Sequence, residues 1–441
     1  MTPQIQCSVG IAVSMQDSWK HTALETRIEI LKRYIALIAD DAQTWRDLIS
    51  EETGKAQWDA QLEVNAALAK LDISIQSFMD HCKAVDPELQ EQDGMSINYH
   101  PLGSIAILSP FNFPLHLCNG HLLPALLAGN TAVIKPSEYT PKIGQKIMDT
   151  LNRAGLPKGV VTLVQGDAET SKTLISDPRI AAVCFTGSSQ TGQKIKVQLA
   201  GTHTIPILEM GGNNPYIVSE ISDIRTAVYL SIVSAFISSG QRCTCARRLL
   251  LIRGKTPNSY LEQLQEAIQT IRVGGPNDPD IFMGPLIHRQ SADEVLRQEA
   301  ALIDLGASPI IPLQRLDDDA LLSPGLIDCT SLDSPFDEEI FGPLLQVYWV
   351  DSFDEAIQMA NDTQYGLSAG LLSDSKDEFL RAKAELNAGI VNWNQPSTGA
   401  SSRAPFGGIK ASGNLRATAF DAAKYCSYPM VSQYKSSLEY P

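Results

Sequence analysis

The first hundred residues carry apolar side chains at spacings of three and four positions, with charged residues between them. One such stretch extends from Trp19 to Ile49, and a second extends from about Lys55 to Phe78. In the first stretch the repeat is set by Ile28, Leu31, Ile35 and Ile38. This period is typical of amphipathic α-helices, so both stretches are predicted to be helical. The polar and acidic segment from Asp86 to Met95 is predicted to be a connection.

From Gly103 onward the pattern changes to short apolar runs that alternate with helical stretches. Five runs have the length of buried strands: SIAILS (104–109), TAVIKPS (131–137), VVTLVQG (160–166), AAVCFTGS (181–188) and TIPILEMGG (204–212). The helices predicted between them cover 116–128, 142–154, a short segment after 166, and 190–200. This alternation predicts a parallel, doubly wound sheet, which binds ligands at the carboxyl ends of its strands.

The second half of the chain repeats the alternation less regularly. Helices are predicted over 223–239, 258–272, 289–305, 353–361 and 376–387. Strands are predicted over 247–252, 344–350, 369–373 and 389–394. These elements suffice for a second α/β domain. The last stretch, Tyr425–Tyr434, is predicted to be an exposed strand, and such edges often pair with another subunit.

Composition and charge narrow the classes of partner. The chain has 35 basic and 50 acidic residues, a formal net charge of −15. A surface with this balance repels phosphate backbones, which argues against nucleic-acid and anionic-membrane partners. The uncharged stretch Pro101–Ile134 is apolar, but it contains four prolines and several polar residues. We therefore expect a buried strand–helix–strand there, because a bilayer helix needs about 20 mainly apolar residues in regular structure.

The cysteines and the N-terminus indicate the compartment. The eight cysteines are irregularly placed, as in a protein of the reducing cytosol and unlike a disulfide framework. The first residues lack the basic segment of a secretory signal. We therefore predict a cytoplasmic protein.

Cys243 is the first candidate for chemistry. It lies in SSGQRCTCARR (238–248), just after a predicted helix. A thiol is only a few per cent ionised at neutral pH, but neighbouring arginines could lower its pKa. A buried structural cysteine is the alternative. A metal site at Cys-Thr-Cys would need further ligands at suitable spacing, and none occurs, so no metal is predicted.

Two further residues could assist a nucleophile. Glu209 ends an apolar strand in LEMGGNNP (208–215), where partial burial would raise the pKa of its carboxyl toward that of a general base. Asn112, between two aromatic residues, has an amide that could donate to an oxyanion. Each could instead be a structural residue, with Glu209 in an ion pair and Asn112 in a turn.

Two loops at strand ends could bind a dinucleotide. FTGSSQTG (185–192) opens a helix, so its backbone N–H groups suit a pyrophosphate. In KPSE (135–138), Lys135 could contact ribose or phosphate oxygens, and Glu138 could accept hydrogen bonds from ribose hydroxyls. An ordinary strand-to-helix turn and a solvated loop are the alternatives.

These motifs, taken in order, resemble one family, the NAD(P)-dependent aldehyde dehydrogenases. The resemblance covers the chain from about residue 17 to its end, and the interval from Glu209 to Cys243 matches the spacing usual in the family. The motifs that carry it are PFNFP, AGNTAVIKPSE, FTGS, LEMGGNNP, GQRC, EEIFGP (338–343) and PFGGIKASG (405–413).

The resemblance implies a role for each candidate. Cys243 would attack the aldehyde, Asn112 would stabilise the oxyanion, and Glu209 would activate the water that hydrolyses the thioester. NAD is the implied cofactor, with Lys135 and Glu138 at its adenosine ribose and with Glu339 and Phe341 at its nicotinamide end. The implied pyrophosphate site comprises Gly187, Ser188, Ser189, Gln190, Thr191 and Gly192.

The resemblance also implies a fold of two doubly wound parallel-sheet domains with a small oligomerisation element. The NAD-binding domain would comprise 1–85 and 102–210, the catalytic domain 211–412, and the oligomerisation element 86–101 and 413–441. Members of the family usually begin with strands that flank the cofactor domain, and these strands are expected to be missing here. A homodimer or higher homo-oligomer is expected.

The motifs NGHLLPALLAGN (119–130), GQRCTCARRLL (240–250) and GIVNWNQPSTGA (389–400) are similar to a branch that oxidises anionic semialdehydes. Arginines suit the carboxylates of such substrates. The candidates are Arg242, Arg247, Arg248 and Arg403. Alternatives are another semialdehyde substrate, a CoA-acylating enzyme, which would not need a base at Glu209, and a non-catalytic protein on the same fold.

Overall fold

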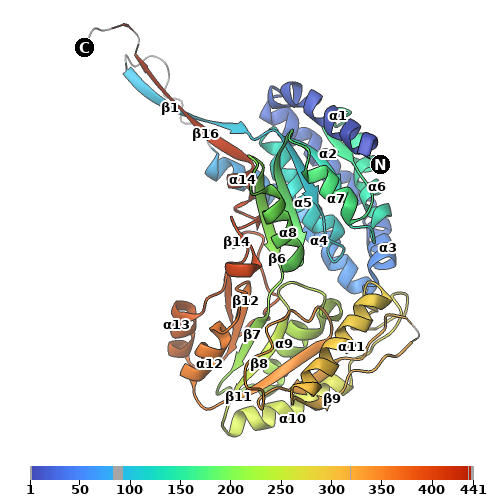
Figure 1. The fold of residues 1–441 in the computed structure, drawn as a ribbon, viewed down its shortest axis with the longest axis vertical. Coiled ribbons are helices and arrows are strands. Elements are labelled where there is room, and N and C mark those ends of the chain that lie inside the picture. Colours follow the sequence, from blue (N-terminus) through green and yellow to red (C-terminus); the bar gives the residue numbers. More distant parts are fainter. Residues whose placement is uncertain (1, 83–92, 318, 436, 439–441) are drawn as a thin grey trace.

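The computed structural model describes residues 2–82, 93–317, 319–435 and 437–438, and it consists of two α/β lobes and a projecting ribbon (Figure 1). The expected connection at 86–95 lies largely outside the described residues. Its last part, 93–95, belongs to a strand, because these residues pair with the C-terminal strand of the chain.

Four helices precede the first sheet: α1 (Thr2–Lys20), α2 (Leu24–Asp40), α3 (Ala42–Thr53) and α4 (Gln57–His81). The predicted helical stretches correspond to α2, α3 and α4. Helix α1 begins ahead of the first helix that the sequence predicted, and its buried residues have helical spacing. They are Ile5, Val9, Ala12 and Trp19.

The first sheet is entirely parallel, with strand order β4-β3-β2-β5-β6. Its strands are β2 (Ser104–Leu108), β3 (Thr131–Lys135), β4 (Val161–Leu163), β5 (Ile180–Gly187) and β6 (Ile205–Met210). The helices between them are α5 (Pro114–Leu127), α6 (Pro141–Arg153), α7 (Ala168–Ile175) and α8 (Ser189–Leu199). The alternation predicted for 104–212 is therefore confirmed.

Helices cover both faces of this sheet, and successive strand residues point to opposite faces. Ile105 and Ile107 pack into one core with α2 to α6, whereas Ala106 and Leu108 pack into another with α1, α7 and α8. Two-sided burial explains why the strands are apolar throughout.

The second sheet has seven strands in the order β13-β12-β7-β8-β11-β10-β9. They are β7 (Asn214–Val218), β8 (Ala246–Ile252), β9 (Ser308–Ile311), β10 (Gly325–Asp328), β11 (Leu344–Val350), β12 (Ser368–Leu372) and β13 (Ile390–Trp393). Its helices are α9 (Ile224–Phe236), α10 (Lys255–Gln269), α11 (Arg289–Asp304), α12 (Phe353–Asn361) and α13 (Lys376–Glu385). The second α/β lobe is thus confirmed. The expectation of a wholly parallel sheet needs one correction, because edge strand β9 runs antiparallel to β10.

Three strands of this sheet were not predicted from the sequence, namely β7, β9 and β10. Strand β7 follows β6 after only three residues, so the pattern merges them into one run. Strands β9 and β10 have four residues each and lie at one edge, where the apolar signal is short.

The predicted C-terminal strand is β16 (Ser427–Lys435), which pairs antiparallel with β1 (Asp93–Pro101) over nine residue pairs. The two strands form a ribbon that extends away from the lobes (Figure 1). The preceding segment contains β14 (Pro405–Phe406), η2 (Lys410–Ser412), β15 (Thr418–Ala419) and α14 (Ala422–Tyr425). Helix α14 packs against α4 and α5 of the first lobe. In the described residues, no helix is long and apolar enough to cross a membrane.

Candidate active site

Cys243, Glu209 and Asn112 line one cavity of about 710 Å³ at the carboxyl ends of the first sheet's strands, together with several of the predicted cofactor residues. This volume lies in the range of about 300–1,000 Å³ typical of ligand sites. The first lobe contributes residues of the loops after β2, β3 and β5, and the second lobe contributes Cys243, Glu339 and Phe341. The topological prediction of a site at these strand ends is thus in agreement with the structure.

Cys243 follows a tight turn that interrupts the chain between α9 and β8. The 3₁₀ turn η1 (Ile237–Gly240) contains Ser238 and Ser239, with φ of 53° and 56°, followed by Gly240 with φ of 73°. A Cβ on Gly240 would lie 2.1 Å from the Gly342 carbonyl oxygen. The turn therefore requires glycine both for its left-handed conformation and for the close approach of the 342 backbone.

The two cysteines of this segment have different surroundings. Cys243 is half-buried and lines the cavity, whereas Cys245 is fully buried with its thiol toward the Ile237 carbonyl. Burial and the nearby carboxylates of Glu209 and Glu339 raise the pKa of the Cys243 thiol well above its ordinary value. The free thiol is therefore protonated at neutral pH and needs a base before it can attack.

Glu209 is the residue that the sequence predicted as a general base. It lies at the end of β6, is 1% exposed, and lines the same cavity as Cys243. Neither carboxylate oxygen has a hydrogen-bond partner of ordinary geometry among the described residues. Burial raises the pKa of Glu209 to about 8, and the charge of Glu339 acts in the same direction. A carboxyl group with a pKa close to physiological pH can both accept and release a proton.

Asn112 lies in the loop between β2 and α5 and is 7% exposed. Its side-chain Nδ2 donates a hydrogen bond to the Gln241 carbonyl at 2.9 Å, two residues before Cys243. An amide nitrogen carries two hydrogens, so this contact fixes the Asn112 amide and leaves a second donor.

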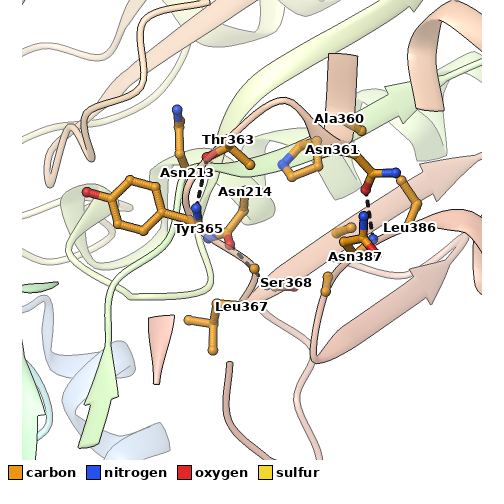
Figure 2. A pocket seen from close by; sticks show the side chains of 14 residues that line it. Asn213, Asn214, Ala360, Asn361, Thr363, Tyr365, Leu367, Ser368, Leu386 and Asn387 are labelled. Carbon is orange, nitrogen blue, oxygen red and sulfur yellow. Dashed lines mark hydrogen bonds between the residues drawn. The ribbon is translucent and has the colours of Figure 1, made fainter. Parts of the chain in front are cut away.

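Asn214 was not predicted from the sequence. It connects the segment that contains Cys243 and Cys245 to strand β7 of the second sheet. Its Nδ2 donates to the carbonyls of Cys243 and Cys245 at 2.7 and 2.8 Å, and its Oδ1 accepts from the Ser368 backbone N–H at 3.0 Å. Figure 2 shows Asn214 beside Ser368 in a small cavity of about 10 Å³, which holds about one water molecule. Its place next to Asn213 in LEMGGNNP was the available signal.

The KPSE segment lines the cavity at the end of β3. Lys135 is 4% exposed, donates to the Pro136 carbonyl, and lies 3.9 Å from a carboxylate oxygen of Glu138. Glu138 has a side chain that is 46% exposed. Both residues line the cavity.

The six residues of the predicted pyrophosphate site divide between two faces of α8. Gly187, Ser188 and Thr191 line the cavity, and the Ser188 hydroxyl caps the helix by accepting from the Thr191 N–H. Ser189, Gln190 and Gly192 lie on the opposite side of the helix. A Cβ on Gly192 would lie 2.1 Å from the Met210 sulfur, so this glycine serves the packing of α8 on β6.

Two lysines that line the cavity were not predicted from the sequence, Lys172 on α7 and Lys194 on α8. Both are exposed, and ammonium groups there suit phosphate oxygens. Lys194 is one helical turn from Thr191, so its position on the face of FTGSSQTG toward the cavity was the signal that could have identified it.

Glu339 and Phe341 form the cavity wall nearest the second lobe. A Glu339 oxygen accepts from the Gly212 N–H at 3.2 Å, and burial raises the pKa of Glu339 to about 7. A Cβ on Gly211 would lie 1.7 Å from Glu339, so only glycine leaves room for this carboxylate. Phe341 meets Phe111 edge to face, with ring centroids 6.1 Å apart.

Arg248 and Arg247 are occupied by other contacts. Both are fully buried. Arg248 donates to the carbonyls of Asn213, Met359 and Ala360. Arg247 donates to the carbonyls of Arg242 and Gly342. These contacts anchor the catalytic segment to the second lobe, and neither arginine lines the cavity.

The other two predicted arginines differ in exposure. Arg242 is half-buried and forms an ion pair with Asp59 at 2.6 Å. Arg403 is exposed and lies in the segment before β14. Among the described residues, no group of three or more His, Cys, Asp or Glu could hold a metal ion.

Residues 2–430 match the aldehyde dehydrogenase family, and the chain belongs to that family. The resemblance and the fold class are confirmed, and the protein is an aldehyde-oxidising enzyme that uses NAD(P).

Three relatives illustrate the similarity. The chain is 46% identical over 443 residues to N-succinylglutamate 5-semialdehyde dehydrogenase of Erwinia tasmaniensis, covering 99% of this chain and 89% of the relative. It is 29% identical to an indole-3-acetaldehyde dehydrogenase solved in complex with NAD+, with a TM-score of 0.92 and 98% and 89% of the two chains covered. An NADP-dependent enzyme of E. coli is 27% identical, with a TM-score of 0.92 and 98% and 90% covered.

Proposed function

We propose that this enzyme oxidises N-succinylglutamate 5-semialdehyde to N-succinylglutamate, with NAD and water as co-substrates. The observation that carries the chemistry is the meeting of Cys243, Glu209 and Asn112 in one cavity. The similarity over nearly the whole length to a dehydrogenase of that semialdehyde supports the substrate.

The mechanism begins with a proton transfer from the Cys243 thiol to Glu209. The thiolate adds to the aldehyde carbon, and the oxyanion is stabilised by the Asn112 amide and the Cys243 backbone N–H. NAD supplies the acceptor for the hydride that leaves this carbon, which converts the adduct into a thioester on Cys243. Glu209 first releases the thiol proton to solvent, and its carboxylate then takes a proton from water. The hydroxide attacks the thioester carbon, the C–S bond breaks, and the proton of the resulting carboxylic acid passes to the Cys243 thiolate, which leaves the carboxylate product and the thiol.

The residues present fit the dinucleotide. The capped start of α8 offers Ser188, Thr191 and Lys194 to a pyrophosphate. Lys135 and Glu138 would hold the adenosine ribose, and Glu339 and Phe341 would position the nicotinamide end. Glu138 favours NAD, because a carboxylate accepts from ribose hydroxyls and repels a 2′-phosphate.

We further propose that the enzyme is a cytoplasmic homo-oligomer, at least a dimer, assembled through the β1–β16 ribbon. Four large apolar side chains are exposed on the ribbon: Met95, Tyr428, Met430 and Val431. A two-stranded ribbon has little stability alone, so a second copy of the chain would complete its packing. All eight cysteines are free thiols, which supports a reducing compartment.

The experiment is a panel of aldehydes with NAD, read by NADH absorbance. N-Succinylglutamate semialdehyde should have a higher kcat/KM than succinate semialdehyde, glutamate semialdehyde and acetaldehyde. Cys243→Ala should abolish NADH formation, whereas Cys245→Ala is the matched control and should keep most of it. The substrate proposal would fail if acetaldehyde matched the N-succinyl compound, and the catalytic assignment would fail if the two cysteine variants behaved the other way round.

A further inference from the structure

Helix α4 carries a line of charged residues into the interior beside the active site. Asp59, Glu63 and Lys70 are each at most 2% exposed, and their spacing of four and seven residues places them on one face of the helix. The two carboxylates are paired, Asp59 with Arg242 at 2.6 Å and Glu63 with Lys55 at 2.7 Å.

Lys70 has no such partner. Among the described residues, no carboxylate lies within ion-pair distance of its ammonium group, and its hydrogen-bond partner is the Ser402 hydroxyl at 3.3 Å. Burial lowers the pKa of Lys70 to about 8, so the group is still mainly charged at pH 7. A buried ammonium without a counter-ion carries a desolvation penalty, which an anionic ligand would offset.

The surroundings of Lys70 supply further polar groups. On the facing helix α5, Gly120 has no side chain, and a Cβ there would lie 3.9 Å from the ammonium nitrogen. One turn earlier on α5, the Nδ1 atom of His116 is buried without a hydrogen-bond partner of ordinary geometry among the described residues. Burial and the charges of Lys70, Lys55 and Arg242 lower the pKa of His116 well below its ordinary value, so this imidazole is neutral.

The same cluster reaches the reacting groups. The Phe113 ring lies between two cations, with the Lys55 nitrogen 3.5 Å and the Arg242 guanidinium carbon 4.9 Å from its centroid. Phe113 directly follows Asn112, and Arg242 directly precedes Cys243. The cationic cluster therefore begins next to the nucleophile and extends along α5 to Lys70.

We propose that Lys70, with the Ser402 hydroxyl and the His116 imidazole, binds the terminal carboxylate of the substrate's N-succinyl group. This inference rests on the proposed function and adds a specificity-determining residue to it. The ammonium group and the carboxylate form a charge-assisted hydrogen bond in which Lys70 donates, and Ser402 donates a second.

The length of the substrate favours the succinyl carboxylate over the α-carboxylate. From Phe113 to Gly120, α5 advances by roughly 10 Å. An extended chain gains about 1.2 Å per bond, so the succinyl carboxylate, eight bonds from the aldehyde carbon, lies about 10 Å away. The α-carboxylate, four bonds from the aldehyde carbon, extends only about 5 Å.

The test compares two substrates that differ only in the terminal carboxylate. N-Succinylglutamate semialdehyde and its N-acetyl analogue share the aldehyde, the α-carboxylate and the amide. The wild-type enzyme should prefer the N-succinyl compound by roughly 10- to 100-fold in kcat/KM, the contribution of one charge-assisted contact. Lys70→Met should abolish this preference, mainly by raising KM for the N-succinyl compound, and should leave kinetics with the N-acetyl analogue within about threefold.

Two further variants make the result specific. Lys70→Arg keeps the positive charge and should retain part of the preference. Lys383→Met removes an exposed lysine of α13 and is the matched control, with no change expected for either substrate. Lys70→Met should unfold at the same or a higher temperature than the wild type, because it removes a buried charge. A loss of activity with both substrates would assign Lys70 to the structure and overturn the inference.

The outcomes also separate this inference from the proposed function. A wild-type enzyme that oxidises other aldehydes but neither glutamate-derived semialdehyde contradicts both. A wild-type enzyme that oxidises the N-succinyl and N-acetyl compounds equally well, or a Lys70→Met variant that keeps the wild-type preference, contradicts only the role of Lys70.

Discussion

Glu209 shows how burial alone can prepare a side chain for catalysis. Both of its oxygens lack partners of ordinary geometry within the described structure, and its pKa is raised to about 8. In water the same carboxyl group would be almost fully ionised at neutral pH and would be a weak base. Burial therefore gives this carboxyl group a pKa in the range expected of a general base.

This raised pKa predicts a pH dependence of turnover. Glu209 acts as a base in its carboxylate form, whose fraction increases as the pH rises through about 8. Steady-state kcat should therefore increase with pH between about 6 and 9 and level off above the pKa. A pH series of NADH formation measures this, and a kcat that is flat across this range would exclude rate-limiting base catalysis by Glu209.

Glu209→Gln should separate the two halves of the reaction. The amide keeps the size of the side chain but cannot accept the proton, so turnover should fall by roughly 10²- to 10⁴-fold. Water or neighbouring groups can still deprotonate Cys243 once, so we expect a burst near one NADH per site. Rapid mixing detects the burst, and mass spectrometry detects the trapped acyl-enzyme. If burst and turnover both disappear, no other group replaces Glu209 in deprotonating the thiol, or Glu209 supports the structure.

Glu138 should control the choice between NAD and NADP. Its carboxylate lines the cavity and is partly exposed, so its repulsion of a 2′-phosphate is screened by solvent. We expect kcat/KM for NAD to exceed that for NADP by about tenfold or more, and Glu138→Gln to reduce the ratio. Equal values for the two cofactors in the wild-type enzyme would remove Glu138 as the cause of a preference.

At the scale of elements, the turn η1 sets the position of Cys243. It ends α9, passes through three residues with positive φ, and directs the Cys243 segment toward β6 of the other lobe. Asn214 on β7, through its bonds to the Cys243 and Cys245 carbonyls, holds the segment from the opposite side. The position of the thiol therefore depends on backbone contacts from several strands.

Gly240→Ala should disrupt this element. The added Cβ would meet the Gly342 carbonyl oxygen, and φ near 73° costs a non-glycine residue about 1–2 kcal/mol. We expect kcat/KM to fall at least about tenfold, with a lower midpoint of thermal unfolding. Gly201→Ala is the matched control, because a Cβ there meets nothing within 4 Å. Wild-type activity in Gly240→Ala would show that the turn tolerates displacement.

At the scale of the whole molecule, the ribbon of β1 and β16 has only two strands and exposes apolar side chains. It projects from the lobes (Figure 1). Its exposed side chains include large apolar ones, among them Met430 and Val431. Cross-strand pairing joins residues more than 300 positions apart, so the ribbon depends on long-range contacts.

Val431→Glu should weaken the assembly of copies of the chain. Val431 is 56% exposed, and a carboxylate there would have to be desolvated in an apolar interface. Light scattering should give a multiple of 48.0 kDa for the wild type and a mass shifted toward the monomer for the variant. Val197→Glu, the same substitution at an exposed valine of α8 outside the ribbon, is the matched control. A monomeric wild type would contradict assembly through the ribbon.

Much of the first lobe could be predicted from the sequence because its information is local. Strands buried on both faces need continuous apolar runs, and helices on a sheet need a three-to-four repeat, so β2 to β6 and their helices were identified. The same reasoning fails for β9 and β10, whose four-residue runs carry too little signal.

The sequence by itself also determined the family and the candidate chemical groups, because motifs such as LEMGGNNP and GQRC combine residue type with spacing along the chain. Tertiary structure decided what each group can do. Glu209 is buried in the cavity that Cys243 lines, and Arg247 and Arg248 donate to backbone carbonyls. On α8, the side that faces away from the cavity carries Ser189, Gln190 and Gly192. Lys70 has no counter-ion among the described residues. Burial and pairing depend on residues hundreds of positions apart, and no local pattern records those distances.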